Sequence, residues 1–129
     1  MHKKKVLIVT DIGYDFDDAM AISFAVNSPE LELCGVVTVH DPNKEYCVRH
    51  EKALVARRLL SDLGAENIPV YSEEGQARIA SDETRKAYSA IEIYTSKQLE
   101  ALSIETQGGI DFLVERMIES QGNIALSSI

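Results

Sequence analysis

The segment KVLIVTDIGYDFDDAMAISFAVN, residues 5–27, decides the fold class, because an apolar run, an acidic loop and a second apolar run follow one another in it. Residues 5–10 form a continuous β-rich run, typical of a strand buried on both faces of a parallel sheet. Residues 17–27 are apolar on nearly every side, which predicts a central rather than a superficial helix. A strand followed by a helix in this way is the first unit of an α/β fold.

The rest of the chain repeats this alternation. We expect further strands at residues 31–39, 68–72 and 123–129, and further helices at residues 47–63 and 109–122. The polar stretch 73–108 is weakly patterned and holds one expected helix, over residues 84–101. The alternation predicts a Rossmann-like open, mainly parallel sheet with flanking helices, in a single domain over residues 1–129.

The expected helix over residues 47–63 has an apolar side and a solvent-facing side. Gly64 is predicted to end it, since glycine readily adopts the left-handed conformation that follows a helix. We expect the solvent-facing side to carry the charged residues Arg49, Lys52, Arg57, Arg58 and Asp62.

Composition and charge exclude several classes of protein. The chain has 129 residues, is 45% hydrophobic and carries a formal net charge of −8, whereas nucleic-acid binding needs a basic surface. No stretch reaches the ~18 consecutive apolar residues of a membrane span, and residues 6–9 are too short for a signal-peptide core. We therefore expect a cytoplasmic protein without membrane or nucleic-acid partners. Cys34 and Cys47 fit no metal-binding spacing and are expected to be free thiols.

The loop between the first strand and the first helix concentrates negative charge. Four aspartates lie within eight positions between apolar flanks: Asp11, Asp15, Asp17 and Asp18. Carboxylates this close repel one another unless they are protonated, exposed to water or bound to a cation. The apolar flanks argue against full exposure, so the pattern favours a site for a hard, oxygen-preferring cation. A solvated acidic turn that caps the helix is the alternative.

Other polar residues follow the remaining strands. His40 and Asp41 come directly after the second expected strand, and Ile129 ends the fourth. Ligands of open parallel sheets bind at the carboxyl ends of the strands, so we expect these positions to share one edge with Asp11.

Three familiar acidic motifs do not fit this loop. An EF-hand needs glycine at its sixth position, where Phe16 stands when counting from Asp11. A phosphotransferase of the haloacid-dehalogenase type needs an aspartate where Gly13 stands, and a response-regulator receiver has a different loop.

The stretch TDIGYDFDDAMAI, residues 10–22, resembles the N-terminal signature of the nucleoside hydrolase family, the inosine–uridine-preferring N-ribohydrolases. That signature places an aspartate and a glycine after the first strand, and Asp-Asp-Ala at the start of a buried helix. This chain has a longer form, in which YDF supplies two extra residues. The stretches SPELELCGVVTV (28–39), ARRLLSDLGAENIPVYS (56–72) and IDFLVERMIESQGNIALSSI (110–129) resemble later elements of the same family.

The resemblance implies calcium-dependent hydrolysis of the N-glycosidic bond of ribonucleosides or related ribosides. Ca²⁺ would hold the ribose 2′- and 3′-hydroxyls and a water molecule. By position, Asp11 matches the ligand that is also the catalytic base, Asp18 the bidentate ligand, and Asp17 the residue that binds the sugar hydroxyls. Asp15 lies in the two-residue insertion and is either a further metal ligand or a helix-entry cap.

Further positions are compared with the same family. Ile129 falls where the family uses a backbone carbonyl as a metal ligand. The family's asparagine after the second strand has two alternative counterparts, Asp41 and Asn43, which would bind the substrate. His40 either approaches the sugar or makes an ordinary loop hydrogen bond, and His50 is expected to lie on the surface of a helix.

The resemblance covers the N-terminal part of the family, so it implies that further site groups lie beyond Ile129. We therefore expect a truncated domain with at least one sheet face that lacks its helices, favouring a homo-oligomer or a complementing chain. Three functions stay open: a hydrolase completed from elsewhere, a metal- or sugar-binding remnant without turnover, and an interaction domain whose aspartates cap a helix.

Overall fold

The computed structural model describes residues 2–13, 16–39, 45–46, 50–73, 78–79, 81, 83, 94–99 and 102–129. Its elements follow in the order β1 (Lys4–Thr10), α1 (Asp17–Asn27), β2 (Leu31–Val39), β3 (Glu45–Tyr46), α2 (Glu51–Asp62), β4 (Val70–Glu73), β5 (Arg78–Ile79), α4 (Ser96–Leu99), α5 (Gly109–Glu119) and β6 (Ile124–Ser128). None of the helices described is long and apolar enough to cross a membrane.

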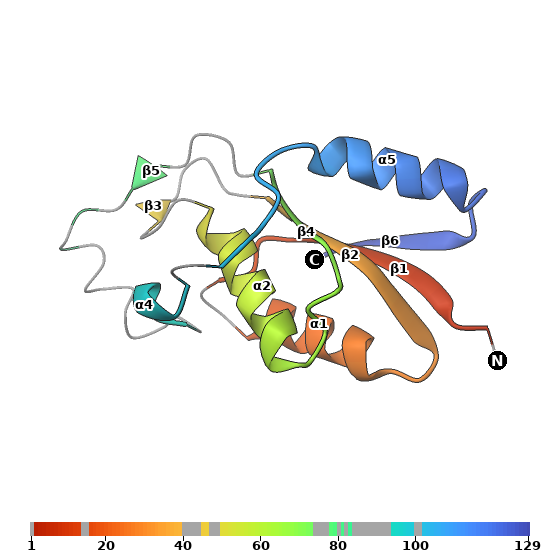
Figure 1. Ribbon diagram of the computed structural model, residues 1–129, viewed down its shortest axis with the longest axis horizontal. Coiled ribbons are helices and arrows are strands. Elements are labelled where there is room, and N and C mark those ends of the chain that lie inside the picture. The colour runs from red at the N-terminus through yellow and green to blue at the C-terminus, as the bar shows by residue number, and fades with distance from the viewer. Residues whose placement is uncertain are drawn as a thin grey trace.

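The main sheet is four-stranded and parallel, with the strand order β4-β2-β1-β6 (Figure 1). The predicted α/β fold with a parallel sheet is thus confirmed. β1 and β2 run side by side, with Thr10 opposite Thr38, and β6 pairs with the other edge of β1. The carboxyl ends of the strands therefore meet at one edge of the sheet. The short strands β3 and β5 pair separately.

Helices lie on both faces of the sheet: α1 and α2 cover one face, and α5 lies over the other (Figure 1). The larger core lies under α1 and α2, where Ile8 and Val36 of the sheet pack with Ile22 of α1 and Leu60 of α2. Alternation along β1 sends Leu7 to the opposite face, where it packs with Val37 and Phe112 in a smaller core.

Helix α5 is anchored to the sheet by a few close contacts. The ring of Phe112 stacks on Tyr71 with 4.5 Å between the ring centroids. A Cβ atom on Gly35 would lie 2.5 Å from two ring carbons of Phe112, so glycine at this position makes room for the ring. The amide of Gly109 donates to Glu73 Oε1 at 2.6 Å, which fixes the start of the helix.

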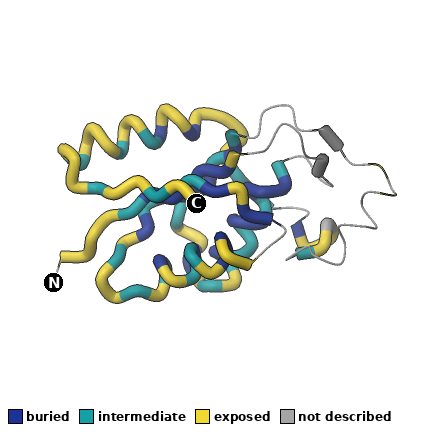
Figure 2. Tube along the Cα trace, turned by 180° about the vertical axis from the view of Figure 1, so that it is seen from behind, coloured by how far each residue is buried: buried dark blue, intermediate teal, exposed yellow. Residues whose placement is uncertain are grey.

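The face under α5 is only partly covered. In α5 the buried residues are Gly109 and Phe112, and Figure 2 shows most of the helix as exposed. Leu126 of β6 is 46% exposed on this side of the structure. α5 thus occupies this face but leaves much of its apolar surface open, and the expectation of a sheet face that lacks some of its helices stays a prediction.

Helix α1 has the predicted bounds but not the predicted central position. Ala19, Ile22 and Ala25 face the sheet and are buried. The opposite side carries a stripe at helical spacing, Phe16, Met20 and Phe24, whose exposed fractions are 71%, 69% and 70%. The helix is thus superficial, and its outer apolar side faces solvent in the part of the chain that the structure describes.

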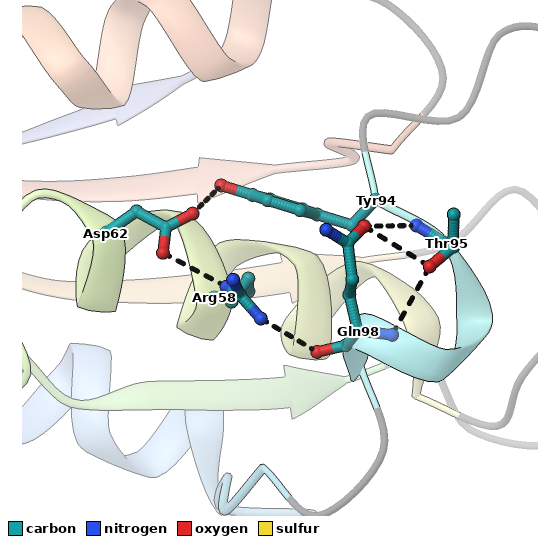
Figure 3. Close-up of polar contacts among 5 residues, drawn as sticks. All are labelled: Arg58, Asp62, Tyr94, Thr95 and Gln98. Atoms are coloured by element: carbon teal, nitrogen blue, oxygen red, sulfur yellow. Dashed lines mark hydrogen bonds and ion pairs between the residues drawn. The ribbon is translucent and has the colours of Figure 1, made fainter.

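Helix α4 and the residues before it dock on α2 through polar contacts (Figure 3). Asp62 accepts a hydrogen bond from the Tyr94 hydroxyl at 2.8 Å and pairs with Arg58 Nε at 3.0 Å. Arg58 also donates to the backbone carbonyl of Gln98 at 3.3 Å, and its guanidinium lies over the Tyr94 ring. Burial, reinforced by the Asp62 carboxylate, raises the pKa of Tyr94 to about 12. The Tyr94 hydrogen bond in turn lowers the pKa of Asp62.

Candidate functional site

The candidate site is built around Asp18, which lies in the first turn of α1 and is 6% exposed. The Thr10 hydroxyl donates to Asp18 Oδ2 at 2.6 Å, and the same hydroxyl oxygen accepts the amide of Ile12 at 3.1 Å. Thr10 is the last residue of β1 and is fully buried. One threonine thus joins the end of β1, the acidic loop and the first turn of α1.

Two further carboxylates lie beside Asp18. Burial is the largest cause that raises the pKa of Asp18; the hydrogen bond from Thr10 lowers it. The interaction with the Asp11 side chain raises this pKa further, as does repulsion from Asp11 and Asp17. Asp11 and Asp17 are themselves exposed, and Asp17 Oδ1 accepts the amide of Asp18 at 3.0 Å.

This arrangement fits a cation chemically. Neighbouring carboxylates favour a proton or a cation beside them, because two adjacent negative charges are unfavourable in a partly buried site. Carboxylate oxygens at the end of a strand are ligands of the kind that Ca²⁺ takes. Within the described ranges, no group of three or more acidic, histidine or cysteine side chains able to hold a metal ion is present.

Several predicted site residues cannot be compared with the structure. Asp15, His40, Asp41 and Asn43 lie outside the described residues. Of the predicted site residues within them, Asp11, Asp17 and Asp18 come together at the carboxyl end of β1.

Ile129 also lies at this edge of the sheet. Its amide donates to the carbonyl of Val9 at 2.9 Å, so it continues the pairing of β6 with the end of β1. The prediction that Asp11 and Ile129 lie at the same edge of the sheet is thus confirmed, and the pairing of β6 with β1 makes their strands neighbours.

Lys52 was predicted on the solvent-facing side of α2, and this prediction was wrong. It is 2% exposed, and its Nζ donates to the carbonyl of Asp11 at 2.5 Å and to that of Ile12 at 3.3 Å. The prediction followed the residue type and overlooked the spacing. Lys52 stands three and four positions before the buried residues Val55 and Ala56, which places it on the apolar side of the helix.

The predicted position of His50 was also wrong. It precedes α2 in the left-handed conformation, with φ at 58°, and is half-buried rather than lying on the surface of the helix. Its Nδ1 lies 2.8 Å from the Ser72 hydroxyl of β4. Ser72, Thr38 and Thr10 stand in one register row across β4, β2 and β1, and all three are buried. This row of hydroxyls lies just below the edge that carries the aspartates.

Comparisons with known proteins give a consistent picture. No family model matches the chain. A curated relative from Arabidopsis thaliana, described as "Probable uridine nucleosidase 2", is 41% identical over 68 residues, which are 53% of this chain and 19% of the relative.

Two solved structures share the fold. The plant nucleoside hydrolase PpNRh1 matches with a TM-score of 0.63 and 26% identity, over 99% of this chain and 40% of its own. The type III effector protein XopQ, solved in complex with adenosine diphosphate ribose, matches with a TM-score of 0.67 and 19% identity, over 98% of this chain and 35% of its own. The chain spans less than half of either solved chain. In sequence and fold it is nucleoside hydrolase-like, over part of the length of these relatives.

Proposed function

We propose that this chain provides the metal- and sugar-binding part of a site that hydrolyses the N-glycosidic bond of ribonucleosides or related ribosides, with Ca²⁺ as the metal. One observation carries the proposal: the buried carboxyl of Asp18, in the first turn of α1, accepts the Thr10 hydroxyl at 2.6 Å and so lies at the carboxyl end of β1, which directly precedes Asp11. The likeness to a plant nucleoside hydrolase supports the choice of reaction.

In this proposal the residues divide into two groups. Asp11 and Asp18 would hold the metal, with Asp15 and the backbone carbonyl of Ile129 as further ligands. Asp17, exposed beside them, would accept hydrogen bonds from the ribose hydroxyls. From the loop after β2, either Asp41 or Asn43 would contribute to substrate binding.

When bound, Ca²⁺ would lower the pKa of a water molecule and share its coordination sphere with the sugar diol. Asp11 would accept a proton from the attacking water molecule while the water oxygen forms a bond to the anomeric carbon. The electron pair of the broken C–N bond would leave with the nucleobase, and the proton that the nucleobase takes up from solvent balances the one that Asp11 accepts. Positive charge develops on the sugar ring, and the neighbouring carboxylates stabilise it. Thr10 holds the Asp18 carboxyl in one orientation during these steps.

Calorimetric titration of calcium into the purified chain, with and without ribose, tests the proposal. Saturable binding that ribose strengthens is the expected result. Asp18→Asn should abolish this binding, because it removes the buried negative charge. Asp111→Asn is the matched control, since Asp111 is an exposed aspartate in the first turn of another helix. Unchanged affinity in the Asp18→Asn variant would refute the site assignment.

Riboside cleavage then separates the remaining functions. If the chain binds calcium and ribose but does not cleave ribosides, a binding remnant is favoured. If it neither binds calcium nor cleaves ribosides, an interaction domain is favoured. The proposal includes a cytoplasmic location, and a homo-oligomer or a complementing chain that completes the site. Mixing the chain with a candidate second half and assaying cleavage tests that completion.

A further inference from the structure

We infer that Lys52 is a positioning residue that fixes the acidic loop, residues 11–13, before any metal binds. Its Nζ contacts the carbonyl oxygens of Asp11 and Ile12, two consecutive residues of this loop. The effect of Lys52 on calcium affinity rests on the proposed function, whereas its effect on the order of the loop does not.

The burial of Lys52 makes hydrogen-bond acceptors for its ammonium group necessary. Lys52 is 2% exposed, and a buried ammonium group is unfavourable unless its protons are donated to acceptors. Two of those acceptors are the loop carbonyls, and hydrogen bonds from a charged donor are stronger than neutral ones. Gly13 leaves space for the group, since a Cβ atom there would lie 3.2 Å from Nζ.

The loop is held from two directions. The amide of Ile12 donates to the Thr10 hydroxyl, while the carbonyl of Ile12 accepts from Lys52. The Ile12 side chain is fully buried between these two anchors. Both peptide groups of residue 12 are therefore fixed, and so is the backbone from which the Asp11 side chain projects.

The charge of Lys52 has a second effect. It brings a positive charge to the backbone that carries Asp11, next to Asp18. This charge offsets part of the repulsion between the carboxylates, which would otherwise favour an opened loop in the absence of metal. A loop ordered in advance binds a ligand with a smaller entropic cost.

The test compares Lys52→Met with Arg57→Met. Arg57 is a matched control, because it also projects from α2 and donates to two loop carbonyls, those of Ile68 at 2.7 Å and Ala65 at 3.4 Å. Amide hydrogen exchange is measured on the metal-free chain, after correction for global stability. We expect Lys52→Met to speed exchange of the Ile12 and Gly13 amides by about tenfold or more, as for loss of a hydrogen bond from a charged donor. Arg57→Met should leave these amides unchanged.

Equal exchange at residues 12 and 13 in the two variants would overturn the inference. If Lys52→Met does not fold, Lys52→Gln replaces it, because it removes the ammonium while keeping a polar side chain at this buried position. The same faster exchange is expected, and unaltered exchange would again overturn the inference.

Calcium titration of the same variants separates the two proposals. We expect weaker calcium binding by Lys52→Met than by Arg57→Met; equal or tighter binding would overturn the effect on calcium. If the unmodified chain binds no calcium, the proposed function fails, and the exchange comparison still decides the role of Lys52.

Discussion

Thr10→Val is the substitution that most directly tests how the site is held together. Valine keeps the shape of threonine and removes the hydroxyl that donates to Asp18 and accepts from the amide of Ile12. Thr10 is fully buried, so water cannot replace either partner without opening the structure. The variant thus leaves one buried carboxyl and one buried amide without this partner.

The expected loss follows from these two hydrogen bonds. A hydrogen bond to a charged group contributes about 1.5–3 kcal/mol, and a buried amide left unsatisfied costs about 1–3 kcal/mol. Because one hydroxyl makes both bonds and the loop can relax, we expect the free energy of unfolding to fall by about 2–4 kcal/mol in total. The Thr10 hydrogen bond also lowers the pKa of Asp18. The loss should therefore shrink as the pH falls and Asp18 takes up a proton.

Urea unfolding followed by circular dichroism, without metal, measures this loss. With a slope of about 2 kcal/mol per molar urea, in the middle of the usual range, the midpoint should fall by roughly 1–2 M. Thr38→Val is the matched control: Thr38 is fully buried opposite Thr10, but its hydroxyl makes a long hydrogen bond of 3.4 Å to the carbonyl of Tyr71. Equal losses in the two variants would refute a special role for the Thr10 hydroxyl.

Two further predictions concern other parts of the fold. Gly35→Ala places a Cβ atom 2.5 Å from two carbons of the Phe112 ring, so the ring must move; we expect a loss of about 1–3 kcal/mol, seen as a lower thermal midpoint. An unchanged midpoint would show that α5 adjusts freely. Tyr94 should ionise at about pH 12 in an alkaline absorbance titration, and Tyr94→Phe should remove this step. A tyrosine in the unfolded chain ionises at about pH 10. The stability that the neutral phenol of Tyr94 contributes is therefore complete below that pH and is lost as the pH rises towards 12. If the Tyr94→Phe variant and the unmodified chain unfold identically in alkali, this prediction is contradicted.

Much of the fold could be predicted because its elements are regular. The bounds of α1 and β2 agree with the sequence at both ends, since an apolar run, the stop at SPE (28–30) and a β-rich run follow one another without ambiguity. The position of α1 was wrong for a physical reason. An apolar side chain at every turn predicts burial on every side, but the structure places Met20 and Phe24 on the side away from the sheet.

The site was predicted less completely than the fold. Local spacing placed the aspartates after a strand and at the start of a helix, which is where Asp11 and Asp18 lie. Lys52 acts through backbone carbonyls that lie far from it in sequence. The sequence did contain one signal for Lys52, a charged residue on the apolar side of a helix. Its hydrogen-bond partners, however, depend on how α2 packs against the end of β1.

The strand order has a consequence for how the chain folds. β6 pairs with β1, so contacts such as Lys5 with Ile124 join residues from opposite ends of the sequence. Closing so long a loop carries an entropic cost that rises with its length, and non-local pairing of parallel strands is slow. β1, β2 and β4 can pair with α1 and α2 in place before β6 arrives. Until β6 pairs, β1 would present an open edge beside apolar side chains, and an open strand edge of this kind favours aggregation.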